Sequence, residues 1–172
     1  TYIMNYNLAI IGGGPAGYDA AATAAKKGLS VVLFEKSALG GTCLNVGCIP
    51  TKTLLYSSKL YYNAVNGSKY GIKVENPTFE YDKIVSRKNK IIRKLNAGIR
   101  SKMTNNNVTV ITGTANVVKN ENGIITILCG ETEYTAEKLL VCTGSKVAIP
   151  PIPGVDTASY WTSTEALETK EV

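Results

Sequence analysis

Residues 8–17 read LAIIGGGPAG and decide the fold, because they join an apolar strand-like run to a helix-forming segment. Pro15 suits the first position of a helix, and the alanine-rich residues 16–27 continue it until Gly28, a typical helix end. Residues 30–35, SVVLFE, then predict a second, buried strand. Strand, helix and strand in this order form a βαβ unit, so we expect a parallel sheet.

The glycines of this stretch have the spacing Gly12-x-Gly14-x-x-Gly17, which is typical of dinucleotide-binding loops between a strand and a helix. In such loops the first glycine allows a tight turn, the second lets the backbone approach a pyrophosphate, and the third lets the helix pack closely. Glu35 ends the next strand, where a carboxylate can accept hydrogen bonds from ribose hydroxyls. The alternative is a glycine turn that only packs a helix on a sheet. The motif does not separate FAD from NAD.

Two cysteines stand at the start of a helix expected over residues 43–64, in residues 40–52, GGTCLNVGCIPTK. On an ideal helix, residues five apart are rotated by about 140° and do not share a face. Gly47 and Pro50 can relax the first turn and let the sulfurs of Cys43 and Cys48 meet. A helix N-terminus favours the thiolate, so thiol–disulfide exchange is the favoured use of the pair.

Two alternatives remain for these cysteines: buried structural thiols, or a metal site that includes Cys129 and Cys142. The spacing of Cys43 and Cys48 is longer than in a zinc knuckle, and Cys142 falls inside a strand expected to be buried. We therefore expect no metal site and interpret Cys129 and Cys142 as packing thiols.

The rest of the chain predicts an α/β fold with a mostly parallel sheet, helices and a small antiparallel β-meander. A helix is expected over 81–105 and a strand over 108–112. Three short runs at 115–119, 124–128 and 133–136, with turns between them, predict the meander. A separate buried strand is expected over 138–142, before a proline-rich stretch at 150–153.

Composition excludes several classes of function. Of the 172 residues, 44% are apolar and 19% charged, which is typical of a globular protein, and none is histidine, which excludes a histidine base, triad or metal site here. No signal peptide or transmembrane run is seen, so we expect no membrane partner and a cytoplasmic protein, or one of the mitochondrial matrix if the source is eukaryotic. The net charge of +6 is scattered, with no aromatic residues among the basic ones, so nucleic-acid binding is not expected.

Taken together, these motifs resemble those of the flavoprotein disulfide reductases, the pyridine nucleotide–disulfide oxidoreductase family. Residues 44–52, LNVGCIPTK, and 143–154, TGSKVAIPPIPG, are most similar to the dihydrolipoamide dehydrogenases within that family. The resemblance runs from about Tyr6 to Leu167. Thr51 stands where serine is also common, and Cys142 replaces the usual alanine.

The resemblance implies a Rossmann-like FAD-binding domain and assigns roles to individual residues. Cys43 would be the interchange thiol, Cys48 the charge-transfer thiol and Lys52 a charge near the reactive edge of the flavin. Electrons would pass from dihydrolipoamide, carried by a lipoyl-bearing acyltransferase complex, through the Cys43–Cys48 disulfide and FAD to NAD⁺. The residues implied to contact FAD are Gly12, Gly14, Pro15, Ala16, Gly17, Glu35, Lys36, Gly41, Thr42, Cys43, Cys48, Lys52, Ala115, Thr143, Gly144 and Ser145.

The same resemblance predicts how the chain is organised. Residues 1–149 would form the FAD-binding domain with its redox disulfide, and 150–172 a linker towards an NAD-binding domain that this sequence does not contain. We expect an N-terminal fragment of a homodimeric parent, inactive alone, with an open sheet edge and therefore weak FAD affinity or self-association. Alternative readings are a glutathione- or mercuric-reductase-like enzyme, although glutathione reductases usually carry two lysines at Thr51-Lys52, and a redox-silent flavin-binding module.

Overall fold

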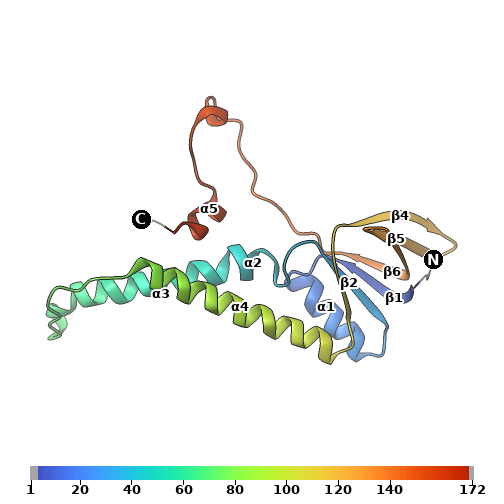
Figure 1. The fold of residues 1–172 in the computed structure, drawn as a ribbon, viewed down its shortest axis with the longest axis horizontal. Coiled ribbons are helices and arrows are strands. Elements are labelled where there is room, and N and C mark those ends of the chain that lie inside the picture. The colour runs from blue at the N-terminus through green and yellow to red at the C-terminus, as the bar shows by residue number, and fades with distance from the viewer. Residues whose placement is uncertain (1–3, 171–172) are drawn as a thin grey trace. The chain divides into compact units, whose positions relative to one another are not determined.

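The computed structural model describes residues 4–170 and contains one six-stranded sheet with helices (Figure 1). The strands are β1 (Met4–Ile11), β2 (Val31–Glu35), β3 (Thr109–Thr112), β4 (Ala115–Glu121), β5 (Ile124–Cys129) and β6 (Thr132–Val141). The helices are α1 (Pro15–Lys26), α2 (Gly41–Val46), α3 (Cys48–Val65), α4 (Tyr81–Asn105) and α5 (Ser163–Glu168), with short 3₁₀ helices at Gly67–Tyr70 and Val155–Thr157. Within residues 4–170, no helix is both long enough and apolar enough to cross a bilayer.

The chain divides into two compact units. The first comprises the described residues up to Cys43 together with Leu95–Lys146, and it holds the whole sheet. The second comprises Leu44–Lys94 together with the described residues from Val147 onward. The expected division into 1–149 and 150–172 stays a prediction, and residues 1–3 and 171–172 lie outside the described part of the chain.

The sheet has the order β3-β2-β1-β6-β5-β4. β1 pairs in parallel with β2 and β6, and β2 in parallel with β3, whereas β5 pairs antiparallel with both β4 and β6. The structure therefore confirms the predicted fold class, a mostly parallel α/β sheet with an antiparallel meander.

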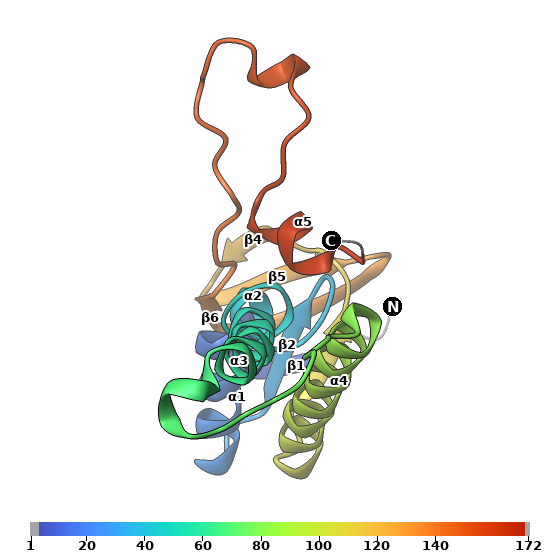
Figure 2. The same cartoon turned by 90° about the vertical axis from the view of Figure 1, so that its left-hand side faces the viewer.

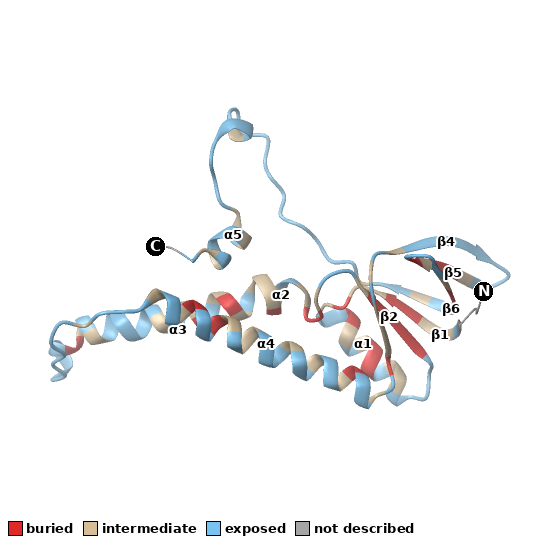
Figure 3. Ribbon diagram, in the orientation of Figure 1, coloured by how far each residue is buried: buried red, intermediate tan, exposed pale blue. Residues whose placement is uncertain are grey.

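Alternating residues of β1 and β2 point to opposite faces of the sheet, and each face is covered. On one face Ile10 and Leu33 pack with residues of α1 and with Met103 of α4. On the other face Phe34 packs with Ile127 of β5 and meets the ring of Tyr134 edge-on at 5.1 Å. Burial on both faces explains why Val31–Phe34 are all buried (Figure 3), as the continuous apolar run predicted.

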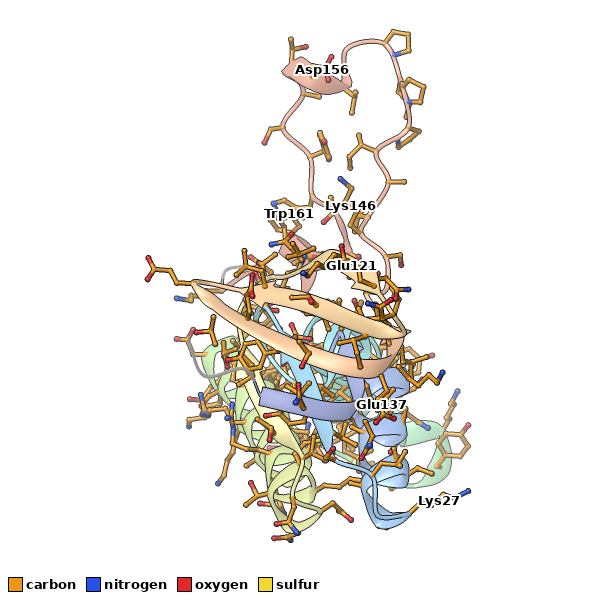
Figure 4. The ribbon with its side chains drawn as sticks, turned by 90° about the vertical axis from the view of Figure 1, so that its right-hand side faces the viewer. Lys27, Glu121, Glu137, Lys146, Asp156 and Trp161 are labelled. Carbon is orange, nitrogen blue, oxygen red and sulfur yellow. The ribbon has the colours of Figure 1, made fainter. Side chains whose placement is uncertain are left out.

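β6 differs from the prediction, because the expected third meander run and the separate strand over 138–142 are one continuous strand. Glu137, labelled in Figure 4, lies between the two expected runs, and β6 continues through it from Thr132 to Val141. Its side chain accepts a hydrogen bond from Asn7 Nδ2 of β1 at 3.4 Å. Within the described residues the second half pairs only with β1. Leu140 and Val141 are consequently 38% and 62% exposed rather than buried, and the sheet has an open edge there.

In the second unit, the helix expected over 43–64 is interrupted at Gly47. Gly47 has φ −145° and ψ −112°, which is not helical, and α3 starts only at Cys48. Residues 147–168 of this unit form a long open loop, seen clearly in Figure 2, that ends in α5. Lys88 on α4 is almost fully buried and donates from Nζ to Leu167 O at 2.5 Å, which holds the end of α5.

Candidate dinucleotide and disulfide site

Two glycines of the 12–17 loop are required by the packing of the protein itself. Gly12 has φ +108°, and a Cβ there would lie 2.1 Å from Cys142 O. A Cβ at Gly17 would lie 1.8 Å from Gly12 O, so any side chain would push α1 away from the loop. These two positions give the tight turn and the close helix packing that the spacing predicted.

Gly14 is different, because neither backbone conformation nor packing requires a glycine there. Its φ of −73° and ψ of −175° suit any residue, and the nearest atom to a built Cβ is Gly41 Cα at 3.7 Å. Gly14 is the N-cap of α1, and its carbonyl accepts a hydrogen bond from Tyr18 N at 2.9 Å, which closes the first turn of the helix. The N–H groups of Ala16 and Gly17 precede that bond, so this helix start can bind an anion.

Glu35 is held against the glycine loop at the carboxyl end of β2. Its Oε2 accepts the Gly13 N–H at 2.7 Å, and its Oε1 accepts the Ser37 N–H at 2.8 Å. Oε1 also accepts from Ser37 Oγ at 3.3 Å, whereas Oε2 has a second lone pair that can accept from a ligand hydroxyl. Gly13 was not singled out from the sequence, although a Cβ there would lie only 2.8 Å from Leu39 Cδ2. The only sign in the sequence that Gly13 must be a glycine is its place in the run Gly12-Gly13-Gly14.

The loop that follows Glu35 runs back to the glycine loop. Lys36 is exposed at its start, and Gly40 N donates to Gly13 O at 2.8 Å. Gly41, with φ +61°, starts α2 so close to Gly14 that its own Cβ would lie 2.8 Å from Gly14 Cα. Thr42 and Cys43 follow in α2. The predicted residues Gly41 and Gly14 are therefore in direct contact.

The remaining predicted cofactor residues of the first unit lie beside the glycine loop and Glu35. Cys142 N donates to Ile11 O at 2.8 Å, which places the start of Thr143-Gly144-Ser145 at the end of β1, beside the glycine loop. Ala115 starts β4 two residues after Gly113, whose N–H donates to Glu35 O at 2.9 Å. The carboxyl ends of parallel strands are where α/β sheets bind ligands, and the predicted residues gather at those ends.

Cys43 and Cys48 form a disulfide, so the two cysteines meet as the sequence predicted. Cys43 lies in α2 and Cys48 is the first residue of α3. The non-helical Gly47 between them removes the rotation that would separate two residues five apart on one helix. Lys52 follows Cys48 by four residues on α3 and is exposed, so the two lie on the same side of that helix.

Cys129 and Cys142 are free thiols. Cys129 is buried in the same cluster as Phe34, in keeping with a packing thiol. Cys142 is only half-buried and follows β6 rather than lying within it, which corrects the expectation of a buried strand there. Within the described part of the chain, no three Cys, Asp or Glu side chains are grouped to hold a metal ion.

Comparisons with known proteins agree with this geometry. A family model described as pyridine nucleotide-disulphide oxidoreductase matches residues 6–172. The dihydrolipoyl dehydrogenase of Zymomonas mobilis is 36% identical over 165 residues, covering 95% of this chain and 35% of that protein. That of Acholeplasma laidlawii is 40% identical over 154 residues, covering 89% and 45%.

A solved structure is also similar. The HOCl-induced flavoprotein disulfide reductase RclA from Escherichia coli superposes with a TM-score of 0.77 at 33% identity, over 96% of this chain and 34% of that one. The chain thus spans between a third and just under half of the length of these proteins. Because the family model covers nearly every residue, the chain belongs to the pyridine nucleotide–disulphide oxidoreductase family.

Proposed function

We propose that this chain is the FAD-binding, disulfide-bearing part of a dihydrolipoyl dehydrogenase. The observation that carries the proposal is the Cys43–Cys48 disulfide in a chain whose glycine loop leaves Gly14 open at the start of α1. A dinucleotide fold alone would fit many enzymes, but a disulfide at this position adds a redox group that accepts two electrons. The similar dihydrolipoyl dehydrogenases support the choice of substrate.

The residues present fit FAD. The helix start at Gly14, Pro15, Ala16 and Gly17 would hold the pyrophosphate, since it offers N–H groups and no blocking side chain. The Glu35 carboxylate would accept hydrogen bonds from the adenosine ribose. Bound FAD would supply electron transfer between the cysteine pair and a nicotinamide cofactor. We further propose that the residues lining the bound FAD include Lys36, Gly41, Thr42, Ala115, Thr143, Gly144 and Ser145.

The cysteine pair performs the chemistry that belongs to this chain. One thiolate of dihydrolipoamide attacks Cys43 Sγ, the Cys43–Cys48 bond breaks, and a mixed disulfide forms while Cys48 leaves as a thiolate. The second substrate thiolate then attacks the substrate's own sulfur in the mixed disulfide. This closes the lipoamide ring and releases Cys43 as a thiolate. The substrate loses two electrons and two protons, and the pair gains two electrons. Lys52, exposed and one turn beyond Cys48 on α3, would place its positive charge near bound FAD.

For the whole protein, the proposal includes electron transfer onward to NAD⁺, a lipoyl-bearing acyltransferase complex as partner and a homodimer. These rest on the resemblance to dihydrolipoyl dehydrogenases, of which this chain spans about a third to under a half.

The test is to mix the purified chain with FAD, remove unbound FAD by desalting and record the visible spectrum before and after adding dihydrolipoamide. A retained flavin band that gains a long-wavelength shoulder on reduction supports both parts of the proposal. A retained band that dihydrolipoamide leaves unchanged favours a redox-silent flavin-binding module. Faster reduction of the disulfide by glutathione than by dihydrolipoamide, at equal thiol concentration, would argue for a glutathione-reductase-like enzyme.

A further inference from the structure

The segment that leads into the disulfide contains two consecutive glycines in left-handed conformation. Gly40 has φ +98° and Gly41 has φ +61°, and Cys43 follows two residues later. Glycine loses more conformational freedom on folding than any other residue, so such a pair does not hold its own position. The contacts made by neighbouring groups must therefore fix the position of Cys43.

A side chain of α4 supplies one of these contacts. Asn96 Nδ2 donates to the Leu39 carbonyl at 2.6 Å, across 57 residues of sequence and within the first compact unit. The Leu39 side chain is itself 2% exposed and packs in the cluster that contains Ile10 and Met103. Leu39 is thus held at its side chain by the core and at its carbonyl by Asn96.

The peptide that joins Leu39 to Gly40 is held from both directions. Its carbonyl accepts from Asn96, and its N–H donates to Gly13 O at 2.8 Å. Gly13 N in turn donates to Glu35 Oε2 at 2.7 Å. A continuous series of hydrogen bonds therefore runs from α4 through this peptide to the glycine loop and to Glu35.

We propose that Asn96 is a positioning residue for the redox loop, defined here as residues 36–42. By holding Leu39 O, it fixes the Gly40–Gly41 backbone against Gly14 and keeps Cys43 in place to close the disulfide. Two effects follow. The dithiol form has less freedom to lose when the disulfide forms, and the start of α1 keeps the shape that a dinucleotide needs. The second effect rests on the proposed function, whereas the first requires only the disulfide.

The test compares Asn96→Ala with Asn106→Ala as a matched control. Asn106 Nδ2 donates to Lys102 O at 2.8 Å, so its loss removes the same kind of half-buried amide–carbonyl bond in the same unit, away from the redox loop. Each variant is equilibrated, without FAD, in mixtures of reduced and oxidised dithiothreitol. Alkylation and mass measurement then give the oxidised fraction, with Cys129 and Cys142 as thiols in both states.

We expect Asn96→Ala to lower the equilibrium constant for disulfide formation about five-fold, the effect of one intramolecular hydrogen bond. Five-fold corresponds to a reduction potential about 20 mV less negative for a two-electron couple. Asn106→Ala should leave the constant within about two-fold of the unmodified chain, although both variants lose similar thermal stability. An equal shift in both variants, or none in either, would overturn the inference.

Two further measurements sharpen the result. Asn96→Asp keeps the shape of the side chain but replaces the donor by a charged acceptor, so it should shift the disulfide equilibrium at least as far as Asn96→Ala. An aspartate variant that matched the unmodified chain would contradict the hydrogen-bond argument. FAD affinity should fall for Asn96→Ala and not for Asn106→Ala. If the unmodified chain bound no FAD, the proposed function would fail, while the dithiothreitol equilibrium would still decide the role of Asn96.

Discussion

Replacing Gly14 with alanine should separate ligand binding from folding. The built Cβ at Gly14 meets nothing closer than Gly41 Cα at 3.7 Å, an ordinary van der Waals distance, and the backbone is extended. The folded chain can therefore accept the methyl group. The same methyl group would stand at the helix start where the proposed pyrophosphate approaches the backbone most closely.

The expected magnitudes follow from this geometry. Alanine is a poorer N-cap than glycine by roughly 0.5–1 kcal/mol, and it restricts the unfolded chain by about 0.4–1 kcal/mol in the opposite direction. The free energy of unfolding should thus change by less than about 1 kcal/mol. Loss of one charge-assisted hydrogen bond from the helix start to a phosphate is worth about 1.5–3 kcal/mol, so FAD affinity should fall roughly ten- to hundred-fold.

Gly17→Ala is the contrasting variant, because its Cβ would lie 1.8 Å from Gly12 O. Such overpacking should lower the free energy of unfolding by about 1–3 kcal/mol. Urea denaturation and titration calorimetry with FAD, run on both variants, give the two quantities independently. If Gly14→Ala kept full FAD affinity and full stability, the pyrophosphate would not approach Gly14. The inference from the open space around Gly14 would then be wrong.

Three further predictions concern the disulfide, a buried lysine and the sheet edge. Cys43→Ser should leave the fold and FAD retention unchanged and abolish the spectral response to dihydrolipoamide. A response that survives would show that the cysteine pair is not the group that dihydrolipoamide reduces. Burial lowers the pKa of Lys88 below its ordinary 10.5, although Glu168 opposes this. Between the lowered pKa and 10.5 the unfolded chain binds more protons, so the free energy of unfolding rises with pH there. Lys88→Met should remove this rise in urea titrations at alkaline pH, and a rise that persists would assign it to another group. The open edge at Leu140 and Val141 should give self-association in sedimentation or weak FAD affinity, and monomeric binding at micromolar or tighter affinity would contradict this.

Local patterns in the sequence were sufficient where one element determines its own conformation. Gly28 predicts the end of α1 from the sequence alone. The structure shows why, because Gly28 adopts φ +87°, which other residues avoid. α4 was predicted from Tyr81 to Asn105, and the structure has those bounds, since an apolar stripe defines a helix without reference to its neighbours. β2 was predicted as buried from its continuous apolar run, which reflects cover on both faces.

Features that depend on pairing between distant segments were not predictable in this way. β6 could not be identified as one strand, because its continuity comes from pairing with β1 along Met4–Ile11, and no local residue encodes that partner. The exposure of Val141 has the same origin, since an apolar residue does not show whether a neighbouring strand lies beside it. Asn96 has no sequence motif at all, and only the fold brings its amide to Leu39 O.

The three motif glycines show how a structure refines a pattern that the sequence reads as uniform. Gly12 and Gly17 are explained completely by the backbone atoms that a side chain would strike, so their presence would be expected even if nothing were bound. Gly14 has no such explanation, because its conformation and surroundings accept alanine. Glycine is the better N-cap, but alanine restricts the unfolded chain by a similar free energy in the opposite direction, so glycine has no net advantage for folding at this position. The remaining reason is a group outside the chain that approaches the backbone there, and an anion at the start of α1 meets that requirement. Evidence for a dinucleotide therefore rests on Gly14 rather than on the motif as a whole.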